Sequence, residues 1–342
     1  GLVGKNLNFK PQLLLGYQLT DRGYDQPAVI DEKYFSSSLV LRNQYQLIDE
    51  QNRQWLLGID YHHENFEYQS FGKNITQSQG EQKGLFTQAN TQIEKDTLLE
   101  AGLRSEILQE KDHVETYQLG LIFWQSLKLQ WATGFKAPSL YQLYSNYGNS
   151  KLLPEKSQSY SASWGHDFIL SAMPTWQQSF SLAAFHSQFD NLISTSSVGS
   201  TLKYENISRS QTRGVELAWS TTDQSWTYSL DFGYQEPKDI EKNRWLSRRP
   251  LQTASVQIQK VLAAHTYQLE TLYSGERVDS FSSTETGSLE SYAVSNLAYR
   301  YQYSKTLQMY LKAKNIFNNR FEQTRGYHDE GLFCTTGLVW EI

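Results

Sequence analysis

The residue types that most often carry out catalysis or bind transition metals are scattered along this sequence of 342 residues. His62 and His63 are adjacent, so on a strand their side chains point to opposite faces and cannot bind one ion together. The sequence contains neither a glycine-rich phosphate-binding loop nor a nucleophile elbow. The single cysteine, Cys334, cannot form an intrachain disulfide. These observations predict a protein that is not an enzyme.

A group of carboxylates near the N-terminus has the chemistry to hold a hard cation. Asp21, Asp25, Asp31 and Glu32 fall within one polar stretch and offer the oxygen ligands that Ca²⁺ prefers. Solvated acids on a loop would give the same pattern. The sequence therefore offers Asp21, Asp25 and Asp31 as candidates for a metal site, with calcium as the possible ion, and predicts no other cofactor.

Apolar and polar residues alternate at every second position along the segments that must position any site. In the segment 307–314, Leu307, Met309, Leu311 and Ala313 alternate with polar residues, and the segment 253–259 does the same. Successive side chains of a strand point to opposite faces, so each segment predicts a strand with one apolar and one polar face. A soluble β-sandwich also alternates in this way.

Composition favours a membrane barrel over a sandwich. Mean hydropathy is −0.59, and no run approaches the roughly 20 apolar residues of a membrane helix, but barrel strands need apolar residues only at every second position. The 22 tyrosines and 9 tryptophans suit aromatic belts at the two membrane interfaces. The net charge is −5 without a basic stretch, so nucleic acid is not a predicted partner.

The pattern predicts an all-β fold, a transmembrane antiparallel up-and-down β-barrel of about 16 strands that occupies residues 1–342. The predicted strands are 7–20, 35–48, 53–67, 83–95, 97–108, 114–125, 126–136, 157–168, 177–192, 203–220, 225–235, 250–262, 265–276, 289–303, 306–317 and 331–342. Short turns alternate with long loops, which are predicted at 21–34, 66–83, 137–156, 236–249, 274–289 and 318–330. The connection 169–175 is longer than the other turns.

The positions of the tryptophans and of the polar side chains agree with a membrane barrel. Six tryptophans lie near the short turns: Trp55, Trp124, Trp176, Trp219, Trp226 and Trp340. Polar residues dominate the face predicted to point inward, among them Arg42, Gln44, Asp60, Lys128, Gln257, Asn296, Arg300, Lys312 and Lys314. A packed apolar core cannot be built from these side chains, whereas a wide lumen can. Gly214 interrupts a long strand and marks a bend or a close backbone approach.

Three segments carry motifs of one known family. They are Trp131–Tyr144 (WATGFKAPSLYQLY) followed by Leu152–Ser157 (LLPEKS), Tyr204–Asn206 followed by Thr212–Glu216 (TRGVE), and Lys314–Phe321 (KNIFNNRF) followed by Gly326–Tyr327. In this order the motifs resemble the "GFRAPSLxELY … LxPEKS", "YxN … GVE" and "NLFDKxY … GY" segments in the barrel of TonB-dependent outer-membrane receptors. The motifs cover roughly the C-terminal two-thirds of the chain.

Within that family the sequence looks most like the vitamin B12 (cobalamin) transporters. The similar segments are Leu246–Arg249, Tyr144–Asn149 and Arg325–Tyr327. Siderophore and haem receptors share much of this pattern. The family has an N-terminal plug domain, a TonB-binding box and a 22-strand barrel, whereas this chain has room for neither plug nor box. Its strands would correspond to the last 16, as expected of a truncated or degenerate receptor.

The resemblance implies active transport of a scarce nutrient, most similar to cobalamin, by a monomer in the outer membrane of a Gram-negative bacterium. The alternatives are a siderophore or haem receptor of the same family, or a passive porin-like channel. The implied partners are the nutrient, outer-membrane lipid and, through the missing N-terminal region, the TonB complex. Aromatic rings give contact area at low entropic cost, and Arg offers a planar hydrogen-bonding fork. The candidate ligand-binding residues are Tyr141, Tyr144, Tyr147, Asn149, Trp245, Arg248, Arg249, Arg325 and Tyr327.

Overall fold

A computed structural model describes residues 8–26, 30–49, 51, 53–108, 112–198, 201–280 and 286–341. Its contacts divide the chain into two compact units, which are treated separately below. The first unit comprises Gly1–Tyr160 and Ser187–Ser210, and the second comprises Ser161–His186 and Gln211–Ile342. No helix among the described residues is long and apolar enough to cross a membrane.

The fold is all-β, and 17 of its described strands form one sheet. The long strands are β1 (Asn8–Gln26), β2 (Ile30–Ile48), β3 (Gln54–Ser70), β4 (Lys73–Glu94), β5 (Thr97–Leu108), β6 (Asp112–Phe123), β7 (Leu127–Lys136), β8 (Glu155–Ile169), β9 (Gln177–Val198), β10 (Thr201–Thr222), β11 (Trp226–Asp239), β13 (Gln252–Leu262), β14 (His265–Ser274), β17 (Tyr292–Gln302), β18 (Leu307–Lys314) and β21 (Phe333–Trp340). The short elements are α1 (Leu140–Tyr144), β12 (Arg244–Trp245), β15 (Arg277–Ser280), β16 (Thr286–Leu289), β19 (Glu322–Thr324) and β20 (Tyr327–His328).

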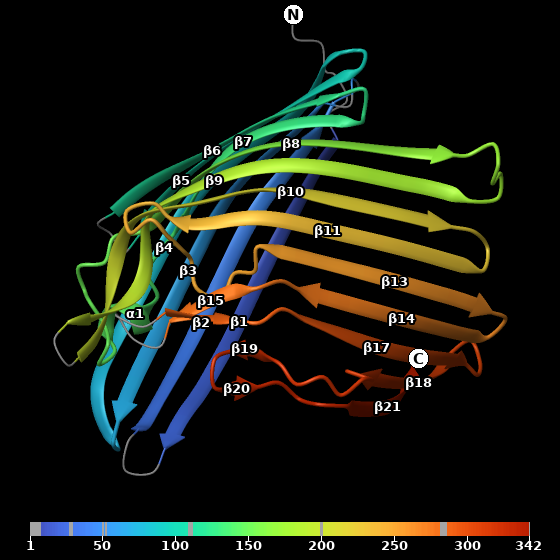
Figure 1. The fold of residues 1–342 in the computed structure, drawn as a ribbon. Coiled ribbons are helices and arrows are strands. Elements are labelled where there is room, and N and C mark those ends of the chain that lie inside the picture. The colour runs from blue at the N-terminus through green and yellow to red at the C-terminus, as the bar shows by residue number, and fades with distance from the viewer. Residues whose placement is uncertain are drawn as a thin grey trace, which may run out of the picture. The chain divides into compact units, whose positions relative to one another are not determined.

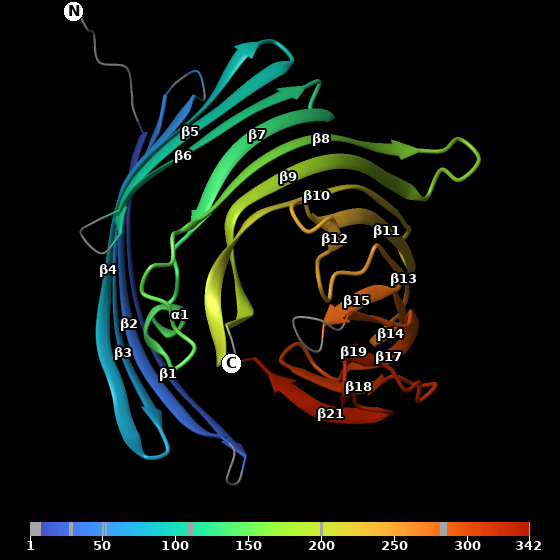
Figure 2. The ribbon, with the colours of Figure 1, turned by 60° about the vertical axis from the view of Figure 1, so that its left-hand side comes forward.

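Neighbouring strands pair antiparallel in chain order, as an up-and-down sheet requires. In the first unit β1 to β7 pair one after another, and Figure 2 shows β1 to β4 as one curved ribbon layer. In the second unit the order is β11, β13, β14, β17, β18 and β21, and Figure 1 shows β13, β14 and β17 side by side. Each of the sixteen predicted strands has its counterpart among the long strands, so the predicted fold class is confirmed.

The predictions of two long loops were wrong, because these residues lie in strands. The stretch 21–34 belongs largely to β1 and β2, and the stretch 66–83 to β3 and β4. Phe71 and Gly72 make a two-residue hairpin turn with φ of 48° and 68°, which is the left-handed pair that such turns favour. Polar residues on both faces resemble a loop in sequence, but an antiparallel ladder is built from backbone groups and needs no apolar face.

The sheet of the second unit has one polar and one apolar face. Asn296 donates a hydrogen bond to Glu270 (3.0 Å) and Arg300 donates one to Gln268 (3.1 Å), so the predicted polar positions share a face. On the other face Leu297 is 46% exposed and Leu311 is 50% exposed. A sandwich would bury this apolar face in a dry middle, so the exposure excludes that alternative.

Aromatic side chains gather at the short-turn end of the second unit. Trp176 and Trp226 lie 5.7 Å from Tyr228 between ring centroids, and the His265 ring stacks 4.9 Å from Tyr301. Trp226, Tyr228, His265 and Tyr301 lie at strand ends beside the turns that precede β11, β14 and β18, and Trp176 lies directly before β9. This clustering is typical of a membrane-interface belt.

Candidate functional site

The first group of predicted site residues lies on α1 and the loop that follows it, in the first unit. The helix begins with a capping box, in which Ser139 Oγ accepts from the Gln142 N–H (3.2 Å) and Gln142 Oε1 accepts from the Ser139 N–H (2.9 Å). These bonds satisfy two donors that a helix start leaves open. Figure 2 shows α1 beside the strands β1 to β4.

An aromatic cluster fixes this helix on β3 and β4. Leu140 and Leu143 are buried in it, and the centroid of the Tyr141 ring lies 5.6 Å from that of Tyr34 and 5.9 Å from that of Tyr68. Tyr144 packs against the same cluster. Tyr141 and Tyr144 therefore stabilise the loop by packing, and a ligand-binding role for them stays a prediction.

The loop after α1 is tied to the family-like segment on β10. Asn149 donates to the Tyr204 carbonyl (3.0 Å), and the Tyr204 N–H donates to the Tyr147 carbonyl (2.9 Å). Asn206 accepts from the Leu153 N–H (2.8 Å) and donates to the Leu153 carbonyl (3.0 Å). Two segments that carry family motifs thus meet. Asn206, which ends the Tyr204–Asn206 motif, holds the Leu152–Ser157 segment through Leu153.

Replacing Asn206 by alanine is expected to loosen this loop. Asn206 also donates to the Asn191 carbonyl (2.6 Å), so three hydrogen bonds would be lost together. The expected cost is about 2 kcal/mol of local stability. Trypsin cleavage after the exposed Lys151 should then be about 30-fold faster, because cleavage follows the population of the open loop.

The matched control is Asn43→Ala on β2, which removes one exposed hydrogen bond to Tyr45 (3.2 Å) outside the loop. That variant should leave the cleavage rate after Lys151 unchanged. Equal rates for Asn206→Ala and the wild-type protein would show that Asn206 does not hold the loop.

A buried carboxylate lies beneath the same loop. Glu32 on β2 is 7% exposed and accepts a hydrogen bond from Tyr147. Burial, together with this carboxylate, raises the pKa of Tyr147 above its usual value, and burial likewise raises that of Tyr141. Sequence reasoning placed Glu32 among loop acids and missed this contact, because the partner lies more than 100 residues away in the chain.

The raised pKa of Tyr147 predicts that the loop weakens in alkali. Above pH about 10 an unfolded Tyr147 loses its proton while the packed one keeps it, so the folded loop binds more protons and its stability falls as pH rises. A spin label on Ser150→Cys, in a Cys334→Ser background, should become more mobile above pH 10. Tyr147→Phe should reduce this response, and an unchanged response would contradict the prediction.

The second group of predicted site residues lies in the second unit, around Asp279. This side chain is 2% exposed and accepts from the Arg248 guanidinium (2.9 Å) and from the Arg325 N–H (3.0 Å). Arg248 has φ of 61°, and its own N–H donates to the Val278 carbonyl (2.7 Å). Asp279 therefore joins three chain segments, and it was not among the predicted residues.

A second buried residue, Arg277, stabilises the same region. It is 5% exposed and donates to the carbonyls of Glu290 (3.3 Å) and Glu322. Its guanidinium carbon lies 5.1 Å from the centroid of the Tyr292 ring, which stacks on Phe321 at 4.1 Å. The hairpins β15–β16 and β19–β20 are thus held together by a buried cation and an aromatic pair.

The remaining predicted residues of this unit are exposed around these anchors. Trp245 is 40% exposed, Tyr327 is 75% exposed, and Arg249 is also exposed. Arg248 and Arg325 point their charges from segments that Asp279 holds in place. Exposed aromatic rings and guanidinium groups in one region can bind a planar or anionic small molecule.

The predicted metal candidates receive no support from the geometry. Asp21 and Asp31 lie on β1 and β2 rather than on a loop, and the side chain of Asp25 lies outside the described residues. Within the described ranges no group of three or more His, Cys, Asp or Glu residues could hold an ion. A calcium site stays a prediction.

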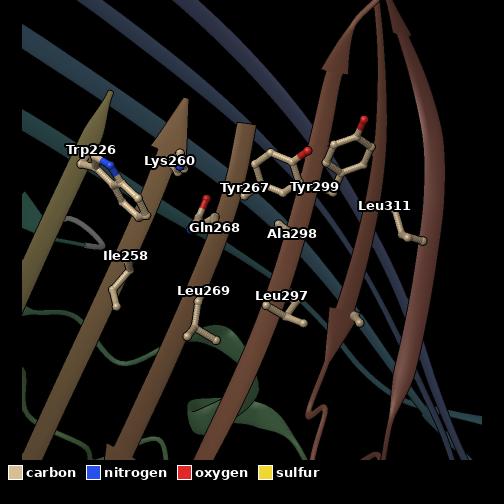
Figure 3. A pocket seen from close by; sticks show the side chains of 11 residues that line it. Trp226, Ile258, Lys260, Tyr267, Gln268, Leu269, Leu297, Ala298, Tyr299 and Leu311 are labelled. Carbon is tan, nitrogen blue, oxygen red and sulfur yellow. The ribbon is translucent and has the colours of Figure 1, made fainter. Parts of the chain in front are cut away.

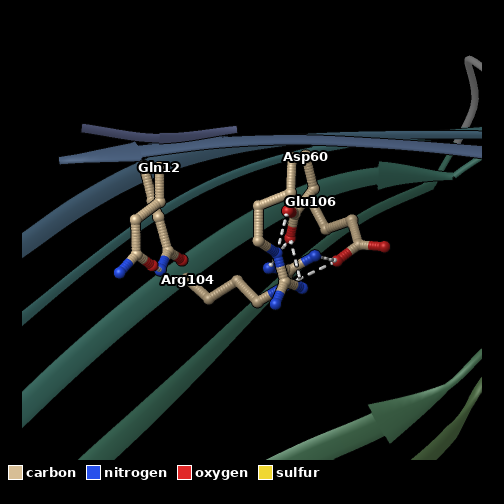
Figure 4. Close-up of polar contacts among 6 residues, drawn as sticks. Gln12, Asp60, Arg104 and Glu106 are labelled. Carbon is tan, nitrogen blue, oxygen red and sulfur yellow. Dashed lines mark hydrogen bonds and ion pairs between the residues drawn. The ribbon is translucent and has the colours of Figure 1, made fainter. Parts of the chain in front are cut away.

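A charge network lies on the polar face of β2 to β5 in the first unit (Figure 4). Asp60 pairs with Arg42 (2.6 Å) and with Arg104 (2.5 Å), and Arg104 also pairs with Glu106 (2.5 Å). The Phe86 ring lies 5.6 Å from the Arg42 guanidinium carbon and occupies the space that a side chain at Gly58 would need. The predicted inward residues Arg42 and Asp60 are thereby confirmed as members of one polar surface.

The chain matches a family model described as "TonB dependent receptor-like, beta-barrel" over residues 4–316. Among solved structures it is similar to the ferric enterobactin receptor of Pseudomonas aeruginosa, with a TM-score of 0.77 and 17% identity over 97% of this chain and 59% of that one. It is also similar to a siderophore receptor of Acinetobacter baumannii, with a TM-score of 0.75 and 14% identity over 96% of this chain and 60% of that one.

A copper transporter gives a further match, with a TM-score of 0.73 and 12% identity over 97% of this chain and 62% of that one. At these identities the likeness shows the fold. The chain spans about three-fifths of the length of the solved structures that it matches.

Proposed function

The chain belongs to the TonB-dependent receptor-like β-barrel family, and from this premise we propose that it is the barrel portion of an outer-membrane receptor for a scarce nutrient. Members of this family are transport receptors rather than enzymes, in agreement with the predicted absence of enzymatic activity. The localisation proposed is the outer membrane of a Gram-negative bacterium, and the proposed partners are the TonB complex, the nutrient and membrane lipid.

The proposed nutrient is a metal complex of an anionic chelator of the siderophore class. The observation that carries this proposal is the set of exposed rings and arginines around Asp279. The rings are Trp245 and Tyr327, and Asp279 binds the Arg248 guanidinium and the Arg325 backbone N–H. Guanidinium groups pair with catecholate or carboxylate oxygens, and the rings add stacking area. The similar structures named above include a ferric enterobactin receptor and a siderophore receptor.

Cobalamin, the nutrient that the sequence motifs favoured, has no support from these comparisons. Two of the three motifs on which that prediction depended, Leu246–Arg249 and Arg325–Tyr327, lie in the Asp279 region, where they build a charged surface. The third, Tyr144–Asn149, lies on α1 and the loop after it in the first unit. That surface suits an anionic ligand at least as well as a corrin amide. Cobalamin therefore serves as the competing ligand in the test.

The test is equilibrium binding to the protein in detergent, followed by quenching of tryptophan fluorescence. Ferric enterobactin should give saturable quenching that cyanocobalamin does not compete away, and Arg248→Ala should weaken it about tenfold. Saturable binding of cyanocobalamin alone would overturn the siderophore proposal. Binding of neither ligand, together with rapid entry of small sugars into vesicles, would support the porin-like alternative.

A further inference from the structure

The apolar face of the second unit contains a groove of about 400 Å³ (Figure 3). It lies on β11, β13, β14, β17 and β18, on the face of the sheet opposite to the polar face that carries Asn296 and Arg300. Its lining combines one cationic, three aromatic and several aliphatic side chains: Lys260; Trp226, Tyr267 and Tyr299; Ile258, Leu269, Leu297 and Leu311. The composition is that of a binding site for an amphiphilic molecule.

The strand register sorts these side chains into two rows. Trp226, Lys260, Tyr267, Tyr299 and Leu311 pair across successive strands, and this row lies nearer to the short turns. The next row on the same face is formed by Ile258, Leu269, Leu297 and Ala313. Rows on one face are two residues apart, which separates the cationic row from the aliphatic row by roughly 7 Å.

Lys260 gives the groove a charged end. Its ammonium lies 4.6 Å from the centroid of the Trp226 ring, and within the described part of the chain it makes no ion pair. The neighbouring Tyr299 hydroxyl is hydrogen-bonded to His265 (2.8 Å), so the aromatic row is fixed in place. A cation at the membrane-interface level of this face can pair with an anionic lipid headgroup.

We propose that this groove binds one phospholipid with an anionic headgroup. The Lys260 ammonium pairs with the headgroup phosphate, the hydroxyl of Tyr267 lies at the level of the ester groups, and an acyl chain covers Leu269, Leu297 and Ala313. Charge complementarity selects the headgroup, and the small side chain of Ala313 leaves room for the chain. The inference rests on the proposed location of the protein in a membrane.

Native mass spectrometry with phosphatidylglycerol and phosphatidylcholine as probes tests this proposal. The wild-type protein should retain one phosphatidylglycerol about fivefold more tightly than phosphatidylcholine, the effect expected of one lysine at a lipid headgroup. Lys260→Gln should remove this preference. Ala313→Leu, which fills the groove, should reduce retention of both lipids.

Lys312→Gln is the matched control, because Lys312 lies on the polar face of the same sheet and should leave the preference unchanged. An equal preference in the wild-type protein and Lys260→Gln would overturn the inference, as would an equal loss in Lys312→Gln. Insertion into vesicles is measured in parallel. A protein that inserts without lipid preference refutes only this site, whereas a protein that does not insert refutes the proposed function as well.

Discussion

Asp279→Ala is expected to weaken ferric enterobactin binding by at least about tenfold, although Asp279 is buried and need not touch the ligand. Its carboxylate holds the Arg248 guanidinium at 2.9 Å and the Arg325 backbone at 3.0 Å. Without it, both arginines lose the position in which they present their charges. A tenfold loss corresponds to about 1.4 kcal/mol.

A structural role alone would not account for the expected pattern. In a double-mutant cycle, the Asp279→Ala and Arg248→Ala double variant should lose less binding than the sum of the two single losses, because Asp279 acts partly through Arg248. Asp231→Ala is the matched control, since Asp231 bonds Ser255 (2.8 Å) on β13 outside the loops. It should bind like the wild-type protein.

Additive losses in the cycle would show that Asp279 does not position Arg248. Full binding by Asp279→Ala, with an unchanged melting temperature, would remove the Asp279 region as the ligand site. These two outcomes are distinguishable. Additive losses would retain Arg248 as a contact of the ligand, whereas full binding by Asp279→Ala would not.

The strands of this fold could be predicted from the sequence because their signal is local. The alternation along 307–314 has the same bounds as β18, within the predicted strand 306–317, because side chains on the two faces of a strand meet different environments. Residues 137–156 were predicted as one long loop, and α1, which begins at the Ser139–Gln142 capping box, was not predicted. The hairpin at Phe71 and Gly72 carried no such signal, because polar strands that continue beyond the apolar zone resemble loops.

The contacts that build the candidate site could not be predicted, because they join residues far apart in the chain. Asn206 and Leu153 are 53 positions apart, Arg325 and Asp279 are 46 apart, and Arg248 and Asp279 are 31 apart. The sequence indicated that Arg248 and Arg325 could bind a ligand. It could not indicate that one buried carboxylate holds both, since that depends on the register of two hairpins.

Gly214→Ala is expected to prevent correct assembly of the sheet. A Cβ atom at Gly214 would lie 2.3 Å from the carbonyl oxygen of Tyr234 and 2.8 Å from the Phe185 ring. The ring can turn, but the carbonyl belongs to the backbone of β11 and cannot move without breaking the ladder. The structure thus confirms the close backbone approach that the sequence predicted at Gly214.

The effect of this one methyl group should exceed the usual overpacking cost of about 1–3 kcal/mol, because the clash is with a backbone atom. Gly165→Ala is the matched control: Gly165 also lies within a long strand, β8, but its added Cβ would meet its nearest atom at an ordinary 3.7 Å. Folding into detergent or lipid vesicles, followed by heat-dependent migration on a gel, separates folded from unfolded protein. Gly165→Ala should fold like the wild-type protein and Gly214→Ala should not; equal folded fractions would mean that β10 and β11 lie farther apart at this point than the structure places them.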